Sequence, residues 1–164
     1  GSGIITPLMR LYVIRHSAAG NRSAWDKPDD LSPLSGKGRR QADAIADTLA
    51  SAGISRLVSS PSVRCVQSLE PLAQRLGQKV EVDERLAEGR DGEEALDLAN
   101  ELRKKVDAAA LCSHGDVIPD MLRILRATTA RFKEPLLWPK ASTWVVTWDS
   151  GRWSKARYIP PPEL

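Results

Sequence analysis

The sequence contains few cysteines and no long run of apolar residues. Among its 164 residues there are only two cysteines, Cys65 and Cys112, and their separation matches no metal-ligand spacing. We therefore expect free thiols in a reducing compartment, with neither a disulfide framework nor a metal site. No apolar run approaches the roughly 18 residues of a membrane span, and no secretory signal is recognisable. These absences predict a cytoplasmic location and no membrane partner.

The sequence also lacks a large excess of either charge. There are 24 Lys and Arg residues against 21 Asp and Glu residues, which gives a net charge of +3 with the histidines neutral. This excess is too small to predict a nucleic-acid partner, although a pI near 9.0 and five tryptophans leave nucleic-acid binding as a last alternative. The composition, with 41% apolar and 27% charged residues, is typical of a soluble globular protein.

The chain length predicts one domain. Residues 1–8 have the character of an expression-vector remnant, and Met9 is the expected native start. Residues 9–164 then have the usual length of a single domain, which is large enough to bury a core without a disulfide or metal. No internal repeat or low-complexity segment divides them.

Strand-like and helical patterns alternate along the chain. Short apolar runs predict strands at 11–15, 56–59, 79–82, 108–113, 143–148 and 152–159. Amphipathic stretches predict helices at 35–53, 61–77, 91–106 and 117–126, with Pro71 kinking or dividing the second. The last two strands are joined by hairpin chemistry at 149–151. This order predicts an α/β fold: a three-layer αβα sandwich with a mostly parallel sheet, helices on both faces and an antiparallel C-terminal edge hairpin.

The two histidines occupy equivalent positions in this pattern. His16 follows the first predicted strand and His114 follows the fourth. In parallel α/β sheets the ligand crevice lies beyond the carboxyl ends of the strands. Although a single histidine is more often structural than functional, their matching placement predicts that both imidazoles face one site.

Arginines surround the same strand ends. Arg15 directly precedes His16, Arg64 lies in the first turn of the helix after the second strand, and Arg22 lies in the polar loop. A guanidinium binds phosphate through two parallel hydrogen bonds, and helix N-termini at this edge add backbone donors. A solvated surface charge is the alternative for each arginine, and the safer interpretation for Arg22. Together they predict a phosphate site.

An imidazole beside guanidinium groups is biased towards its neutral, nucleophilic form. With a phosphate held by the arginines, the natural reaction is phosphoryl transfer to His16, followed by hydrolysis of the phosphohistidine. The leaving group then needs a proton, and Glu84 and Glu88 after the third strand are the candidate acids.

Four ordered motifs resemble those of one family. These are R-H-S at 15–17, L-S-P-L-S-G-K-G-R-R-Q-A at 31–42, S-S-P-S-V-R-C-V-Q-S at 59–68 and C-S-H-G at 112–115. Together they resemble the histidine phosphatase superfamily, with its phosphoglycerate-mutase-like fold, over about residues 11–125. One departure is Ser17, which stands where the family usually has glycine.

The resemblance implies a role for each candidate residue. His16 would be the phosphoryl acceptor, and Arg15, Arg64 and His114 would bind the phosphate. Glu88 matches the family's proton donor better than Glu84, because the acid follows a leucine by two positions. Asn21 or Arg22 would supply a further polar group. The resemblance implies no metal and no cofactor.

The spacing also resembles one branch of the family. A single predicted helix and a strand separate Glu88 from His114, which leaves no room for a helical lid, so we expect a shallow, open site. The chain is similar in this to SixA-type phosphohistidine phosphatases, which implies a phosphorylated protein as partner. It also resembles the phosphatase half of some actinobacterial Nudix fusions, which implies nucleotide or small-metabolite phosphates. A phosphate-recognition module without turnover is the remaining alternative.

Overall fold

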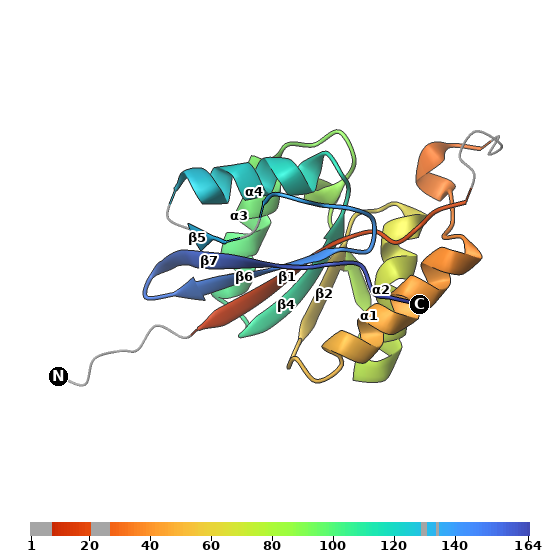
Figure 1. Cartoon of the computed structure of the whole chain (residues 1–164), viewed down its shortest axis with the longest axis horizontal. Helices are drawn as coiled ribbons and strands as arrows, with labels where there is room; N and C mark the ends of the chain where they lie inside the picture. The colour runs from red at the N-terminus through yellow and green to blue at the C-terminus, as the bar shows by residue number, and fades with distance from the viewer. Residues whose placement is uncertain (1–7, 21–26, 129–130, 134) are drawn as a thin grey trace.

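The computed structural model describes residues 8–20, 27–128, 131–133 and 135–164. They form a seven-stranded sheet with strand order β3-β2-β4-β1-β6-β7-β5 and helices on both faces (Figure 1). The strands are β1 (Met9–Arg15), β2 (Arg56–Ser59), β3 (Val80–Val82), β4 (Ala108–Ser113), β5 (Arg131–Phe132), β6 (Thr143–Asp149) and β7 (Arg152–Ile159). The α-helices are α1 (Gly36–Leu49), α2 (Val63–Leu76), α3 (Gly92–Arg103) and α4 (Val117–Ala127), with short 3-10 helices η2 (Asp29–Leu31) and η3 (Glu84–Leu86).

The sheet has the predicted mixture of parallel and antiparallel strands. Strands β1, β4, β2 and β3 are parallel neighbours, whereas β6 runs antiparallel to β1 and β7 antiparallel to β6. The α/β fold with a closing hairpin is therefore confirmed. Strand β5, which pairs in parallel with the outer edge of β7, was not predicted because it is only two residues long.

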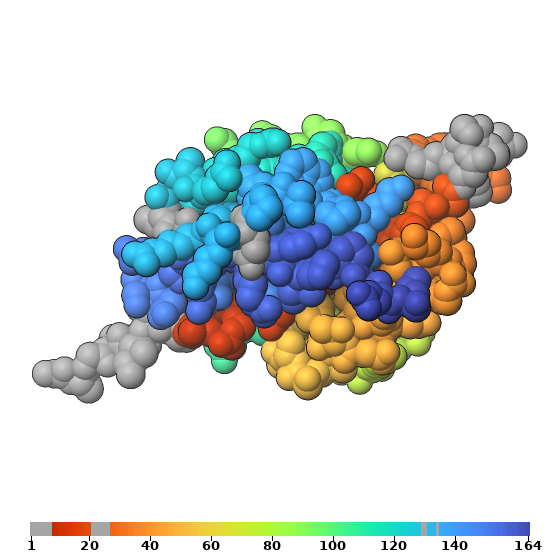
Figure 2. All heavy atoms as spheres, viewed as in Figure 1, coloured from red at the N-terminus to blue at the C-terminus, as the bar shows by residue number. Residues whose placement is uncertain are grey.

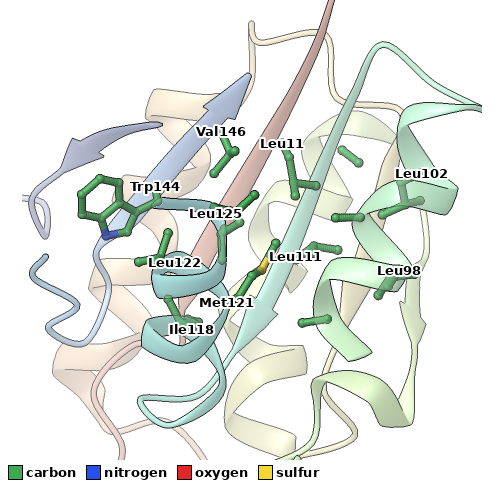
Figure 3. Close-up of a cluster of buried hydrophobic side chains, with 14 of the residues drawn as sticks. Leu11, Leu98, Leu102, Leu111, Ile118, Met121, Leu122, Leu125, Trp144 and Val146 are labelled. Atoms are coloured by element: carbon green, nitrogen blue, oxygen red, sulfur yellow. The ribbon is translucent and has the colours of Figure 1, made fainter. Parts of the chain in front are cut away.

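Two apolar clusters lie on opposite faces of the sheet. Alternate residues of a strand point to opposite sides, so Leu11 and Val13 of β1 pack with α3 and α4, while Tyr12 and Ile14 pack with α1 and α2. Strand β4 is buried along its whole length, as expected for a strand covered on both faces. Figure 3 shows the first cluster, with side chains from β1, β4, β6, α3 and α4 pointing towards one another.

The ends of the helices follow local sequence signals. The Ser35 side chain caps α1 by accepting a hydrogen bond from the Gly38 N–H, and α2 ends at Gly77, which has a φ of 64°. Helix α1 ends at Leu49, before Gly53. Helix α2 continues through Pro71 as one element, so the predicted division of this helix is wrong. Leu69, Leu72 and Ala73, on either side of Pro71, pack into the core, which holds the helix together across the proline. The predicted kink at Pro71 stays a prediction.

The tryptophans of the C-terminal hairpin pack against the body of the protein. Trp144 is buried and its Nε1 donates to the Leu137 carbonyl, while Trp153 is buried and donates to Asn100. The Arg103 guanidinium lies 3.6 Å from the centre of the Trp148 ring. The packing interpretation of these aromatics is confirmed, and Trp153 presents no open face on which a base could stack.

Strand β7 ends at Ile159, before the three consecutive prolines, as the sequence predicted. The space-filling view shows the C-terminal residues lying against α1 (Figure 2). Among the described residues, no helix is both long and apolar enough to span a membrane.

Candidate active site

The two imidazoles meet at one edge of the sheet. Strands β1 and β4 are parallel neighbours in which Arg15 pairs with Ser113, so the next residue of each strand is a histidine at the same level. The ring centres of His16 and His114 are 5.4 Å apart, with an edge-to-face angle of 63°. Both side chains are buried, with 3% and 1% exposure. The predicted convergence of the two histidines is therefore present.

The proton on His16 is placed by its backbone neighbour. The Nδ1 atom lies 2.9 Å from the Ser17 carbonyl oxygen, which can only accept, so Nδ1 carries the proton. The Nε2 atom keeps its lone pair and faces the Nε–H of Arg64 at 3.4 Å. Burial, and then the charge of Arg64, lowers the pKa of His16 to about 3 against the opposing effect of the Ser17 hydrogen bond. The sequence predicted a neutral imidazole from nearby charge alone, whereas burial contributes most.

Arg64 connects the groups of the site. It lies in the first turn of α2 and is fully buried. Its Nε faces His16, and its Nη2 donates to Nδ1 of His114 at 3.4 Å. Its outer edge is held by the Asp29 carbonyl at 2.9 Å and by the carboxylates of Asp29 and Glu88 at 3.3 and 3.2 Å. One guanidinium therefore links both imidazoles to two carboxylates.

His114 is held from the opposite side by the N-terminal region of α2. Its Nε2 lies 2.8 Å from the Ser60 Oγ, 3.4 Å from the Ser62 Oγ and 3.5 Å from the Cys65 Sγ. Because Nδ1 accepts from Arg64, Nε2 carries the proton and donates to Ser60. No sequence signal identified the two serines or Cys65 as part of the site, and Cys65 was predicted only as a core residue.

The Arg15 guanidinium lies beside the imidazoles and packs against Gly115, the residue that follows His114. A Cβ on Gly115 would come 2.8 Å from the Arg15 Cζ, so only glycine allows the guanidinium to lie this close. Nη1 donates to the Trp138 carbonyl at 3.0 Å, while the buried Nε has no hydrogen-bond partner among the described residues. Burial and the charge of Arg64 lower the pKa of Arg15. At least the Nε donor of this guanidinium is therefore unpaired in the described part of the chain.

Carboxylates surround the entrance to the site. Asp29, Asp30, Glu84 and Glu88, here called the acidic rim, line a pocket of about 360 Å³ together with Pro61, Ser62 and Ala87. Both candidate acids reach this pocket, but of the two only Glu88 has an ion pair with Arg64.

The loop carrying η2 packs against the buried guanidinium of the site. Asp29 accepts hydrogen bonds from Arg64 through its backbone carbonyl at 2.9 Å and its carboxylate at 3.3 Å. The shallow, open shape expected of the site stays a prediction. No sequence signal identified Asp29. Of the other predicted site residues, Asn21 and Arg22 lie outside the described residues. In the described part of the chain, no group of three or more His, Cys, Asp or Glu side chains is arranged to hold a metal ion.

Comparison with known proteins places the chain in a family. The model of the histidine phosphatase superfamily (branch 1) matches residues 11–94, just over half of the chain. The chain belongs to the histidine phosphatase superfamily. This histidine phosphatase is 32% identical over 156 residues to an 8-oxo-(d)GTP phosphatase from Mycolicibacterium smegmatis. The match covers 93% of the chain but 48% of the relative, so the chain spans about half of that protein's length.

Solved structures have the same SixA-like fold. SixA from Agrobacterium tumefaciens superposes with a TM-score of 0.73 at 21% identity, over 93% of this histidine phosphatase and 99% of SixA. A protein histidine phosphatase SixA complexed with tungstate gives a TM-score of 0.73 at 22% identity, over 92% and 94% of the two chains. At these identities the similarity establishes the fold alone.

The protonation of His16 can be measured directly. An ordinary histidine takes up a proton near pH 6.5, but with a pKa of about 3 the His16 ring should stay neutral, with its proton on Nδ1, from pH 8 down to pH 5. Long-range ¹H–¹⁵N spectra report both ring nitrogens. Because the chain has only two histidines, a His16→Gln variant assigns the signals. Titration of His16 between pH 6 and 7 would contradict the buried, neutral ring.

Proposed function

We propose that this chain is a metal-independent phosphatase that works through a phosphohistidine intermediate on His16 and acts on phosphohistidine in proteins. The observation that carries the proposal is the unprotonated Nε2 of a buried imidazole, placed beside a buried arginine and a second imidazole. A neutral nitrogen nucleophile and fixed cationic donors are what phosphoryl transfer to an enzyme group requires.

The site residues have distinct roles in this proposal. Arg64 and Arg15 bind the phosphate oxygens, which replace the carboxylates of Asp29 and Glu88 on Nη2 of Arg64. His114 donates to a phosphate oxygen only in the form that carries a proton on Nδ1 as well as on Nε2. The His16 Nε2 attacks phosphorus while the bond from phosphorus to the leaving atom breaks. Once the phosphate has displaced it from Arg64, Glu88 takes up a proton from solvent and donates it to that leaving atom. Water then attacks the phosphohistidine while Glu88 accepts the water's proton, and the bond from phosphorus to His16 breaks, which releases inorganic phosphate and restores His16.

The acidic rim favours a substrate with a single phosphate. A phosphate chain that extended outwards from Arg64 would meet four carboxylates at the entrance, and like charges at these separations repel even when they are partly exposed to water. A neutral or cationic leaving group, such as the imidazole of a phosphohistidine, meets no such repulsion. The SixA-like fold supports the same substrate class.

A nucleotide phosphate is the second candidate substrate. It is favoured by the 32% identity to the 8-oxo-(d)GTP phosphatase over 93% of this chain. An apolar groove of about 330 Å³ also lies beside Arg15, lined by Leu136, Leu137, Trp138 and Pro139. This groove is large enough to hold a base whose phosphate reaches Arg15.

Removing the nucleophile tests the proposed function. A His16→Asn variant should lose about 10³-fold or more of the hydrolysis of an aryl phosphate, while the wild type keeps its activity in the presence of a chelator. Rapid alkaline quench should trap a phosphoenzyme in the wild type and none in the variant. Full activity of the variant would overturn the proposal. Tight phosphate binding with no phosphoenzyme in the wild type would instead identify a recognition module.

The two candidate acids can be separated by their dependence on the leaving group. Loss of a general acid slows poor leaving groups more than good ones, by about 10²-fold or more. Glu88→Gln should therefore impair hydrolysis of an alkyl phosphate far more than that of a nitrophenyl phosphate. Glu84→Gln, from the same pocket, is the matched control and should affect both substrates equally and weakly. The reverse pattern would assign the proton transfer to Glu84.

Neutralising the acidic rim tests the substrate class. The double variant Asp30→Asn, Glu84→Gln should raise kcat/KM for dGTP relative to a phosphohistidine protein by about two- to tenfold at low salt, because two repelling charges are removed. The matched control is Glu93→Gln, Asp97→Asn on the exposed side of α3, which should leave the ratio unchanged. A wild-type enzyme that already prefers dGTP by a large factor would contradict the proposed substrate.

A further inference from the structure

A second charged concavity lies on the sheet, away from the active site. Its volume is about 520 Å³ and five cationic side chains line it, together with Val145, Thr147 and Ala156. These side chains, here called the basic pocket, are Arg10, Arg131, Lys133, Lys155 and Arg157. All five are exposed, whereas Val145 and Thr147 beneath them are buried. The aliphatic stems of the cations cover this floor and their charged ends remain in water.

The strand register places the five cations on one face. Arg10 of β1 pairs with Thr147 of β6, and Thr147 pairs with Lys155 of β7. Lys155 in turn pairs with Arg131 of β5. These residues therefore form one row across four strands that lie about 4.8 Å apart. Arg157 follows Lys155 by two residues of β7, which puts it on the same face. Lys133, one residue beyond β5, lines the same pocket.

The basic pocket lies outside the area covered by helices. It occupies the face on which α1 and α2 pack, because Val145 belongs to their apolar cluster. These helices lie towards the β2 side of the sheet, whereas the basic pocket is on the β6–β7 side (Figure 1). Arg10 and Arg15 are separated by five residues of one strand, or about 17 Å. The basic pocket and the phosphate site are therefore two separate places.

Within the described part of the chain, no carboxylate forms an ion pair with a cation of the basic pocket. Lys155 and Arg131 are directly opposite each other, and like charges in such pairs destabilise a sheet. Among the described residues, which do not include Glu134, none of the salt bridges involves any of the five cations. An anion in the pocket would relieve this repulsion by pairing with several cations at once.

We propose that the basic pocket binds a short oligophosphate anion through its phosphate groups. Five cations exceed the charge of a single phosphate, and the volume lies within the range of small-molecule sites. The lining contains no aromatic side chain on which a base could stack. The recognised chemistry is therefore the phosphate chain itself. The acidic rim would repel the same anion, so we expect the oligophosphate to prefer the basic pocket over the active site.

Titration of the ¹⁵N-labelled full chain with inorganic tripolyphosphate tests this site. Amide signals of 131–133, 145–147 and 155–157 should shift, with smaller changes at 15–17 and 113–115. Reversing two charges in Arg131→Glu, Lys155→Glu should weaken binding at least tenfold. The control Lys104→Glu, Lys105→Glu changes the net charge equally on exposed residues after α3 and should alter the affinity less than threefold. Unchanged aryl phosphate hydrolysis shows that both double variants are folded. If the Arg131→Glu, Lys155→Glu variant is not folded, the milder double variant Arg131→Gln, Lys155→Gln takes its place.

Three results would overturn the proposal. Shifts confined to 15–17 and 113–115 would place the anion in the active site. Equal weakening by the two charge reversals would reduce the effect to net charge. The third result is tighter binding of a polymer or a membrane through the same amides. If single-stranded DNA, or vesicles containing an anionic phospholipid, bound at least tenfold more tightly than tripolyphosphate, this face would be a nucleic-acid or membrane surface.

Discussion

The buried guanidinium of Arg64 is the group on which the arrangement of the active site depends. An arginine keeps its charge inside a protein, and a buried charge is tolerated only when acceptors surround it. Here the acceptors are two imidazole nitrogens, a backbone carbonyl and two carboxylates. They come from the ends of β1 and β4, from η2 and from the turn after η3. Satisfying one side chain therefore brings four separate parts of the chain together.

The same burial gives His16 its chemical character. A ring withdrawn from water and placed beside a cation resists protonation, so its nucleophilic form persists at any physiological pH. The carboxylates of Asp29 and Glu88 pair with Arg64 in the structure at a position that suits the oxygens of a phosphate. A phosphate brings more charge than either carboxylate and can bind a guanidinium through two parallel hydrogen bonds. Phosphate binding would thus replace existing ion pairs and leave the cation paired throughout.

Charge is distributed unevenly over the protein. Four carboxylates gather at the entrance of the active site, and five cations gather on the β6–β7 side of the sheet. Because opposite charges cancel in a sum, the net charge of +3 reveals neither group. The spatial separation matters for function, since each region acts on anions within about one Debye length of it, roughly 8–10 Å at physiological salt.

The alternation of strands and helices and the pairing of His16 with His114 could be predicted from the sequence. Both depend on local periodicity and on the rule that carboxyl ends of parallel strands share an edge. Arg64 was predicted because it opens the helix after a strand. The positions of Asp29 over Arg64, of Ser60 beneath His114 and of β5 along β7 depend on contacts between segments far apart in the chain. No local pattern contains that information, so only the folded chain decides which charges meet and which remain exposed.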